Sequence, residues 1–362
     1  MILSIIFLVF LIVIKLVVML GFQLRFKEAK LLKDESLPKV SVLIPARNEE
    51  EHLPACLDSL IGLDYPLDQL EVLVGDDQST DSTAQVIRQF AARYPHIRYT
   101  SISGAYFGLV ARSNVLAQLA KEASGDYIVF LDADMEVSQG WLRQMVAPTA
   151  LGYELVSGYT EVTKNHWLAA VQQVDWLNVL MWLKVGADMN QPGTALGNNM
   201  LVKKAAYEAI GGYEAIGPTF TEDNDLTLKL RAKGHALFQV VTDEGAFTQP
   251  MKSFSDLWKQ RKRWMSGAFR QPANKLLPVL VSRLFVLWVL LISLTDLDWA
   301  LLLLFQVALL ETALSAFMVI RTKTRISLFT AFIAPVFNSL LDTFTLLTYP
   351  LFKKLVWKGR KL

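Results

Sequence analysis

Apolar residues are concentrated towards the two ends of the chain, and a region of mixed polarity lies between them. Residues 1–22 are almost continuously apolar and contain one charged residue, Lys15. A helix of this length can cross about 30 Å of hydrocarbon. A cleaved signal peptide would have a basic beginning and a small-residue cleavage site, which this segment lacks. We therefore expect residues 1–22 to form an N-terminal transmembrane anchor.

Three more apolar stretches follow residue 272, and each is long enough to span or enter a bilayer. They cover residues 276–294, 299–320 and 326–352. The third stretch is interrupted by Pro335, Asp342 and Pro350. These interruptions favour a re-entrant or interfacial element over a full crossing. The pattern thus predicts two to three C-terminal membrane helices within residues 276–352.

Basic residues beside the apolar stretches indicate the orientation, because positive flanks of a membrane span stay in the cytoplasm. Residues 1–22 are followed by Arg25, Lys27, Lys30 and Lys33. The stretches 299–320 and 326–352 are separated by Arg321, Lys323 and Arg325. We expect a multi-pass protein of the plasma or inner membrane whose middle region is cytoplasmic. Residues 353–362 then form a basic cytoplasmic tail, provided that the third stretch does not cross.

The middle region, residues 38–272, has the pattern of one water-soluble α/β domain. Short β-branched runs predict buried strands at residues 40–46, 70–75, 97–102 and 127–131. Amphipathic stretches between them predict helices at residues 49–60, 83–94 and 113–123. Such alternation requires crossover connections and a mostly parallel sheet. Ligands bind beyond the carboxyl ends of the strands in sheets of this kind.

Composition excludes some classes of function. The 362 residues are 52% apolar, which a water-soluble enzyme seldom shows, and the net charge is +2. Lys and Arg (36) nearly balance Asp and Glu (34), so there is no polybasic footprint of a nucleic-acid-binding protein. The single cysteine, Cys56, can form neither an internal disulfide nor a zinc site with a second thiol. The four histidines have no metal or triad spacing.

Carboxylates follow three of the predicted strands. The first strand runs into Pro45-Ala46-Arg47-Asn48-Glu49, the second into Asp76 and Asp77, and the fourth into Asp132-Ala133-Asp134. Such residues often only cap the next helix, and we expect Asp81 and Ser82 to do so. Carboxylates gathered at one sheet edge repel one another, and a divalent cation is the usual compensation. Metal and diphosphate binding is favoured over a solvated turn for Asp132 and Asp134.

These motifs, in this order, resemble those of glycosyltransferase family 2, the inverting enzymes with a GT-A fold. The resemblance covers residues 40–264 and includes Thr221-Glu222-Asp223. Gln260-Arg261-Lys262-Arg263-Trp264 is similar to the QxxRW signature of the membrane-integrated branch of that family. The resemblance implies an α/β domain of GT-A type that transfers a hexose with inversion.

The resemblance also implies a donor site. Backbone groups of Pro45, Ala46 and Arg47 and the Glu49 carboxylate would hold the nucleoside. Asp76 or Asp77 would accept the uracil imide hydrogen, which suggests a UDP-sugar. Asp132 would contact the ribose and diphosphate, and Asp134 would ligate Mn²⁺ or Mg²⁺. Many family members have Gly-Lys where this chain has Ala111-Arg112; Arg112 can still reach a phosphate, with a different geometry.

For the acceptor side the resemblance implies that Asp223 removes the proton of the acceptor hydroxyl. The alternative is that Glu222 and Asp223 only complement the N-terminus of a helix that begins near residue 224, with Thr221 as its cap. Residues 193–199 resemble an acceptor loop with Asn198 and Asn199, although their glycines could serve only a turn.

Gln260, Arg263 and Trp264 are implied to close over the donor diphosphate and the acceptor. The alternative for this segment is an amphipathic membrane-surface helix, and the two interpretations are compatible.

We expect a membrane glycosyltransferase that uses a UDP-sugar and a metal ion to glycosylate a lipid or glycan acceptor. A processive polysaccharide synthase is the alternative, but export of a polymer needs a transmembrane channel, and about three C-terminal segments favour a lipid. A nucleotidyltransferase is disfavoured because no Gly-rich basic loop lies near the N-terminus. The carboxylates at four motif positions argue against a scaffold without catalysis.

Overall fold

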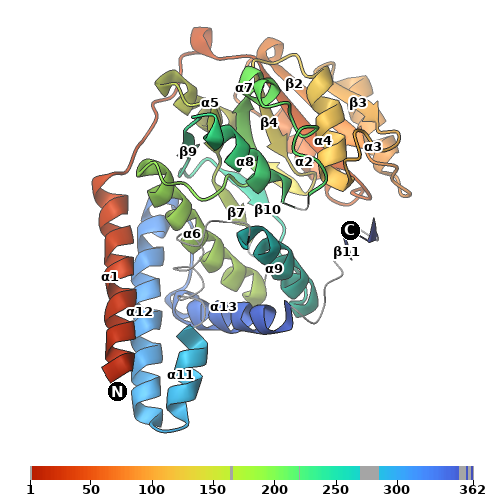
Figure 1. Cartoon of the computed structure of the whole chain (residues 1–362). Helices are drawn as coiled ribbons and strands as arrows, with labels where there is room; N and C mark the ends of the chain where they lie inside the picture. Colours follow the sequence, from red (N-terminus) through yellow and green to blue (C-terminus); the bar gives the residue numbers. More distant parts are fainter. Residues whose placement is uncertain are drawn as a thin grey trace. The chain divides into compact units, whose positions relative to one another are not determined.

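The computed structural model describes residues 2–163, 166–219, 221–269, 285–349, 356–357 and 360–361 (Figure 1). The chain divides into two compact units. The sheet unit comprises Lys27–Thr160 and Gly186–Gln249. The helical unit comprises Met1–Phe26, Glu161–Val185 and Pro250–Leu362. The predicted domain boundary at residue 272 lies outside the described residues, and the domain limits stay predictions.

The sheet unit is built on a seven-stranded sheet with the order β3-β2-β1-β4-β8-β6-β9. The strands are β1 (Val40–Ala46), β2 (Leu70–Asp76), β3 (Ile97–Ser101), β4 (Tyr127–Leu131), β6 (Leu155–Ser157), β8 (Asn199–Lys203) and β9 (Leu237–Gln239). Strands β1 to β4 are parallel to one another, as the alternating pattern predicts. Strand β8 is antiparallel to both β4 and β6. The mixed α/β class is confirmed.

Helices connect and cover these strands. They are α2 (Leu53–Ile61), α3 (Thr83–Arg93), α4 (Ala111–Glu122), α5 (Trp141–Val146), α7 (Lys204–Ala209) and α8 (Glu222–Ala232). A small second sheet pairs β5 (Met135–Val137) antiparallel with β10 (Ala246–Thr248). Strand β7 (Thr160–Val162) lies at the boundary between the units.

The buried run of β1 explains why both faces of the sheet are covered. Successive side chains of a strand point to opposite faces, so an uninterrupted apolar strand needs partners on each side. Val42 and Ile44 belong to the core cluster that contains Leu57 of α2. Leu43 belongs to the other core cluster, with Leu116 of α4. Each fully buried aliphatic side chain contributes about 1.5–3 kcal/mol.

The helical unit contains α1 (Ile2–Leu24), most of α6 (Trp167–Asp188), α9 (Phe254–Ala268), α11 (Phe285–Ser293), α12 (Leu297–Thr322) and α13 (Leu328–Thr348), together with the two-residue strands β11 (Val356–Trp357) and β12 (Arg360–Lys361). Among the described residues, α12 and α13 are long and apolar enough to cross a membrane. Residues 12–24 of α1 form a shorter apolar stretch. The predicted apolar helices are therefore present, although the beginning of the 276–294 stretch and Pro350 lie outside the described residues.

Helices α1 and α12 pack side by side in parallel. Lys15, the charged residue of α1, is buried and forms an ion pair with Glu311. Phe22 meets the Phe317 ring with the centroids 6.4 Å apart. One turn further along, Arg321 lies over the Phe26 ring. The residue numbers rise together in the two helices, so their C-terminal ends lie at the same end of the pair.

Helix α13 runs through Pro335 and Asp342 without a break, and the expected re-entrant or interfacial placement of this stretch stays a prediction. Proline has no N–H group and leaves the carbonyl of the residue four positions earlier without its helical donor. That carbonyl belongs to Ala331, and it accepts a hydrogen bond from the Thr312 hydroxyl of α12 at 3.1 Å. The neighbouring helix thus supplies the lost hydrogen bond, as often occurs for proline in apolar helices.

Candidate active site

The carboxyl ends of β1 and β2 lie together because the two strands are parallel and in register. Ala46 is paired with Asp76. The Asp77 N–H donates to the Ala46 carbonyl at 2.8 Å, and Arg47 Nη1 donates to the Asp77 carbonyl at 2.5 Å. Asp76 and Asp77 are both buried. The two motifs predicted to hold a nucleoside, residues 45–49 and 76–77, are thus brought to one edge of the sheet.

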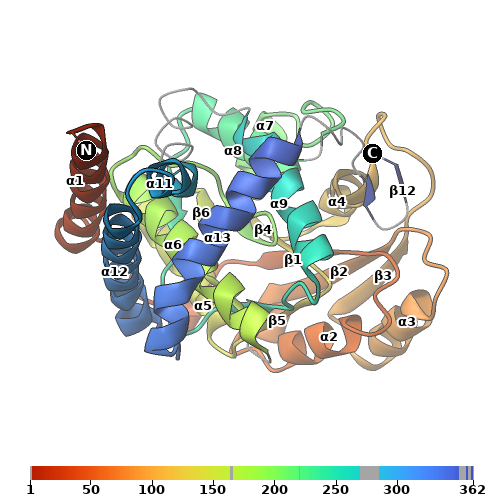
Figure 2. The same cartoon turned by 90° about the horizontal axis from the view of Figure 1, so that it is seen from below.

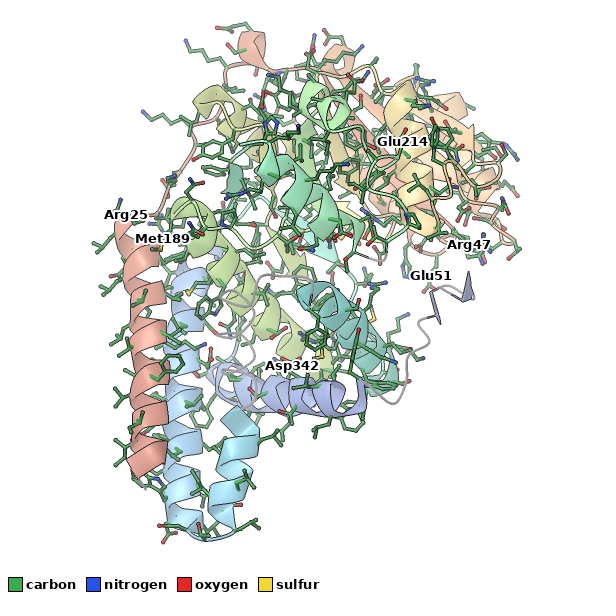
Figure 3. The ribbon with its side chains drawn as sticks, viewed as in Figure 1. Arg25, Arg47, Glu51, Met189, Glu214 and Asp342 are labelled. Atoms are coloured by element: carbon green, nitrogen blue, oxygen red, sulfur yellow. The ribbon has the colours of Figure 1, made fainter. Side chains whose placement is uncertain are left out.

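The loops after β1 and β2 are tied to each other by hydrogen bonds. The Asn48 carboxamide oxygen accepts from the Thr80 N–H at 2.9 Å, and the Glu49 N–H donates to the Thr83 hydroxyl at 2.8 Å. Figure 3 labels Arg47 and Glu51 in the segment after β1. These bonds hold the backbone of the first motif in place.

Of the two residues expected to cap α3, Asp81 does so with its side chain and Ser82 does not. Asp81 accepts hydrogen bonds from the N–H and the hydroxyl of Thr83, so its capping role is confirmed. Ser82 occupies the N-cap position, but its side chain makes no capping hydrogen bond, which corrects that prediction. Its N–H instead donates to Glu50. Asp81 therefore supplies the side-chain cap at this end of α3, in place of Ser82.

Asp132 and Asp134 follow β4, which lies next to β1 in the sheet. The Cys56 thiol lies beneath this edge, and its S–H donates to the Asp132 carbonyl at 3.9 Å. Burial, and then the negative charges of Asp134, Asp132 and Glu49, raise the pKa of the Cys56 thiol. These three carboxylates therefore act on one region, as the sequence predicts. The thiol itself stays protonated and serves as small core filler.

Arg112, in the first turn of α4, joins three elements. Its Nε donates to Asp132 at 2.7 Å, Nη1 to Glu222 at 2.8 Å, and Nη2 to the Gly197 carbonyl at 2.7 Å. Burial would lower the pKa of Arg112, but the Asp132 and Glu222 carboxylates raise it well above its usual value. The fixed fork of a guanidinium suits three partners at once, whereas an ammonium would act as a point charge. All three guanidinium nitrogens are thus engaged within the protein.

Asp223 lies beside this arginine at the start of α8. Its carboxylate accepts from the Gly197 N–H at 3.0 Å and from the Asn224 N–H at 2.8 Å. A Cβ atom at Gly197 would lie 2.7 Å from the Asp223 Cβ, so only glycine allows this approach. Burial, followed by the charge of Glu222, raises the pKa of Asp223 from its ordinary 3.8 to about 6, although Arg112 opposes the shift.

Thr221 does not cap α8 with its side chain, which corrects the predicted cap. Its hydroxyl is buried and has no hydrogen-bond partner among the described residues. The α8 N-terminus carries Glu222, Asp223 and Asp225 in its first turn, and these charges complement the helix dipole. Asp225 accepts from the Thr219 hydroxyl.

The loop before β8 reaches the end of β4, because Asn199 is paired with Leu131. Asn198 points its amide towards the Met135 sulfur at 3.6 Å. Asn199 is fully buried, and its amide bonds the Trp141 indole N–H and the Tyr159 carbonyl. A side chain enclosed in this way cannot contact an acceptor, which contradicts the contact predicted for Asn199. The contact predicted for Asn198 stays a prediction.

Gln260, Arg263 and Trp264 lie on α9 in the helical unit. The Trp264 ring meets the Trp176 ring edge to face, with centroids 5.7 Å apart. The Arg261 guanidinium lies 5.1 Å above Trp264 and is paired with buried Asp175. Sequence reasoning missed these supporting residues because they come from α6, about 90 residues earlier in the chain. The contact of the QxxRW residues with donor and acceptor stays a prediction.

No group of three or more His, Cys, Asp or Glu side chains suited to a metal occurs in the described part of the chain. Mg²⁺ and similar ions in nucleotide-dependent enzymes are often held by one or two carboxylates and the substrate phosphates. Asp134, beside Asp132 at the strand end, supplies oxygen ligands of that kind. The residues present therefore fit a metal that arrives with a diphosphate rather than one held in a complete protein cage.

Comparison with known proteins adds a family and relatives. The family model described as glycosyl transferase family 21 matches residues 4–362. A β-monoglucosyldiacylglycerol synthase of Synechocystis sp. is 28% identical over 245 residues, which are 65% of this chain and 48% of that protein. A poly-β-1,6-N-acetyl-D-glucosamine synthase of Staphylococcus epidermidis is 23% identical over 273 residues, 73% of this chain and 63% of the synthase. The chain spans about half the length of the first of these relatives.

Among solved structures, a mannosyltransferase from Pyrobaculum calidifontis in complex with GDP-Man and Mn²⁺ has a similar fold. Its TM-score is 0.56 at 20% identity, and the match covers 90% of this chain and 94% of that one. At this identity the likeness speaks for the fold alone. It confirms the expected GT-A type of fold.

Proposed function

Because the chain belongs to glycosyl transferase family 21 and is a glycosyltransferase, we propose that it moves a hexose, with inversion, from a UDP-sugar to a lipid at the membrane surface. The family membership confirms the class of enzyme that the motifs predict. The donor, the stereochemistry and the acceptor form the proposal.

The observation that carries the proposal is the bridge made by Arg112. This one guanidinium bonds Asp132, on the side assigned to the donor, and Glu222, the neighbour of the assigned base. Displacement at an anomeric carbon requires the donor phosphates and the acceptor hydroxyl to be held on opposite sides of one carbon atom. A rigid link between the two sets of carboxylates supports such positioning.

In the proposed reaction Asp223 takes the proton of the acceptor hydroxyl. The hydroxyl oxygen forms a bond to the anomeric carbon while the bond from that carbon to the phosphate oxygen breaks, and UDP leaves with the electron pair. A pKa of about 6 keeps Asp223 ionised at neutral pH yet makes it a stronger base than an exposed carboxylate. A single displacement of this kind inverts the anomeric centre.

The donor is assigned to the edge formed by β1, β2 and β4. Asp76 uses one carboxylate oxygen to accept the Ser79 N–H at 3.2 Å, and Asp76 or Asp77 is assigned to the uracil imide hydrogen. Asp132 is assigned to the ribose and diphosphate, and Asp134 to Mn²⁺ or Mg²⁺. A bound divalent ion would neutralise the charge that grows on the departing diphosphate. The GDP-Man and Mn²⁺ of the Pyrobaculum calidifontis complex make a guanine donor the alternative to test.

A lipid acceptor is supported by the apolar helices and by the Synechocystis relative, whose name describes synthesis of a glucosyldiacylglycerol. The Staphylococcus epidermidis relative is named for a polysaccharide, so polymer synthesis is the second candidate.

The arrangement of α1 and α12 supports a cytoplasmic catalytic region. Arg25 follows α1 and Arg321 lies in the last turn of α12, so both basic groups occur at the shared C-terminal end of this parallel pair. Asp296 and Asp298 lie at the opposite end of α12. The positive-inside rule assigns the basic end to the cytoplasm.

Nucleotide release tests the donor assignment. Purified protein in detergent, supplied with a membrane lipid extract, is incubated with UDP-sugars and GDP-sugars, and the free UDP and GDP are quantified. We expect UDP release from one UDP-sugar, loss of release in EDTA and recovery with Mn²⁺ or Mg²⁺. Release of GDP alone would refute the uracil assignment to Asp76 and Asp77, and release that is unaffected by EDTA would refute the metal assignment to Asp134.

A further inference from the structure

Helix α13 presents its large apolar side chains away from the protein. The outward positions with large exposed fractions are Phe329 (77%), Ile333 (41%), Leu340 (45%), Phe344 (45%) and Leu347 (59%). Their spacing of three, four or seven residues places them in one stripe along the helix. An apolar stripe of this size on a protein surface marks contact with another apolar body.

The inward face of α13 consists largely of small and polar residues, with Leu341 buried against Leu168 and Leu257 as the large apolar exception. Ala334 is fully buried in a cluster with Val171 and Val174 of α6. Asn338 is buried and donates to the Val171 carbonyl at 3.2 Å. A helix on the surface of a water-soluble domain has the opposite polarity, with its apolar side inward. Most of the large apolar side chains of α13 therefore lie on its outward side.

The direction of α13 distinguishes it from the other apolar helices of its unit. In Figures 1 and 2, α1, α11 and α12 run in nearly the same direction, and α13 lies across them. If α1 and α12 follow the bilayer normal, α13 lies along the bilayer plane. Figure 3 labels Asp342 on α13. It is two residues from both Leu340 and Phe344, so the 3.6-residue period of a helix places it on the opposite side from them. A helix that lies along the bilayer plane can keep the Asp342 carboxylate on the side that faces the protein.

The apolar surface continues beyond α13 onto its neighbours. The Trp167 ring of α6 is 68% exposed and meets the Phe337 ring with centroids 5.8 Å apart. Phe254 of α9 is 48% exposed and lies 6.0 Å from the Phe344 ring. Aromatic residues are enriched where a protein meets the interface of a bilayer.

We propose that α13 lies flat in the membrane interface, with its outward stripe among the lipid acyl chains. The partner that covers the outward stripe is thus a lipid bilayer, rather than water or a second copy of this chain. The same unit contains α12, which is apolar over a membrane-crossing length and exposes Leu301, Phe305 and Leu309. Continuity with this outward apolar face makes lipid the partner that covers both. The proposal does not depend on which sugar the enzyme transfers.

An α13 that lies flat also agrees with the positive-inside rule for the basic residues that follow it in the sequence. A helix that crossed would move the basic residues 353–362 to the side opposite Arg321 and Arg325. A helix in the plane leaves all these residues on one side, as the positive-inside rule requires.

Depth measurement tests the proposal on the full chain in liposomes. Single cysteines replace Phe329, Leu340 and Leu347 in a Cys56→Ala background, carry a fluorophore, and are quenched with lipids brominated at different depths. Eighteen residues of helix cover about 27 Å. We expect the three positions to report the same depth within about 5 Å. Controls at Leu301 and Leu309 of α12, eight residues apart, should differ by about 12 Å.

Two outcomes would overturn the proposal. A steady change in depth of about 27 Å from residue 329 to residue 347 would show that α13 crosses the bilayer. An absence of lipid quenching, with disulfide formation between Leu340→Cys copies, would show that a second chain covers the stripe. Binding of an added nucleotide-sugar, measured on the same samples, verifies that each variant is folded without relying on catalysis.

Discussion

Replacing Asp223 with asparagine separates a catalytic role from a structural one. The change keeps the size of the side chain but removes its charge and its ability to accept a proton. Asp223 accepts two backbone N–H groups, from Gly197 and Asn224. An asparagine oxygen can serve one of them, so about 1–3 kcal/mol is lost for the buried donor left without a partner.

The removed charge has the opposite effect on stability. The pKa of Asp223 is raised from 3.8 to about 6 in the folded protein, because burial and Glu222 disfavour the anion. Above about pH 6 the folded state therefore carries a cost of at most about 3 kcal/mol for ionising this group, and the cost disappears as the pH falls towards 4. The gain and the loss offset each other within about 2 kcal/mol. We expect the thermal stability of Asp223→Asn to stay close to wild type at neutral pH.

Turnover should respond differently. A lost general base commonly reduces kcat by about 10²- to 10⁴-fold, while binding of the UDP-sugar stays near wild type. The wild-type rate should fall as the pH falls through about 6, because the protonated carboxyl cannot accept a proton. Asp81→Asn alters a carboxylate that caps α3 and accepts the Glu50 N–H but has no assigned catalytic role; it is the matched control and should retain most activity. Near-normal turnover of stable Asp223→Asn would refute the assignment and direct the search to Glu222 or Asp225.

Three further changes test other parts of the account. Asp134→Ala should abolish transfer and leave the domain folded, since loss of a charge at a crowded sheet edge relieves repulsion; retained metal-dependent transfer would contradict the metal site. Arg112→Lys should lower kcat about 10- to 100-fold, because an ammonium cannot replace three guanidinium bonds of about 1.5–3 kcal/mol each; an unchanged kcat would show that the bridge is dispensable. A cysteine at exposed Gln89 of α3 should react with an impermeant maleimide only after cells are opened, whereas reaction in intact cells would reverse the topology.

The central strands were predictable because their patterns are local. β1 and β4 begin and end at the expected residues, and β2 and β3 differ by one residue at one end. Their apolar, β-branched runs require burial on both faces whatever the rest of the fold does. The beginning of α2 was less predictable: the helix begins at Leu53 rather than near residue 49, because the first motif bonds the loop after β2 instead of forming a helical turn.

The candidate site residues were partly predictable. The order of the motifs identified Asp132, Asp223 and Arg112 as candidates. Their contacts depend on packing between distant parts of the chain, which the spacing of residues in the sequence does not predict. Arg112 was expected to reach a phosphate, and the structure engages it with two carboxylates and a carbonyl. Asn199 illustrates the same difficulty, since a loop asparagine near a site has the same sequence signal whether it faces a ligand or the core.

Gly197 was named only within a loop whose glycines could serve a turn. Its role comes from the close approach of Asp223, which no pattern along the chain reveals. Likewise, the hydroxyl of Thr312 on α12 supplies the hydrogen bond that the Ala331 carbonyl, one turn before Pro335, would otherwise lack. Local rules therefore predict where a residue disturbs a helix, but they do not predict whether a neighbouring element compensates.

The claim that this enzyme glycosylates a lipid is tested most directly by mass spectrometry of its products. Purified protein is incubated with a ¹³C-labelled UDP-sugar, Mn²⁺ and a membrane lipid extract, and the lipid and water-soluble fractions are analysed separately. We expect a lipid species heavier by one labelled sugar residue, present with wild-type protein and absent with Asp223→Asn. Labelled sugar found only in a polymeric glycan, with no glycosylated lipid, would contradict it.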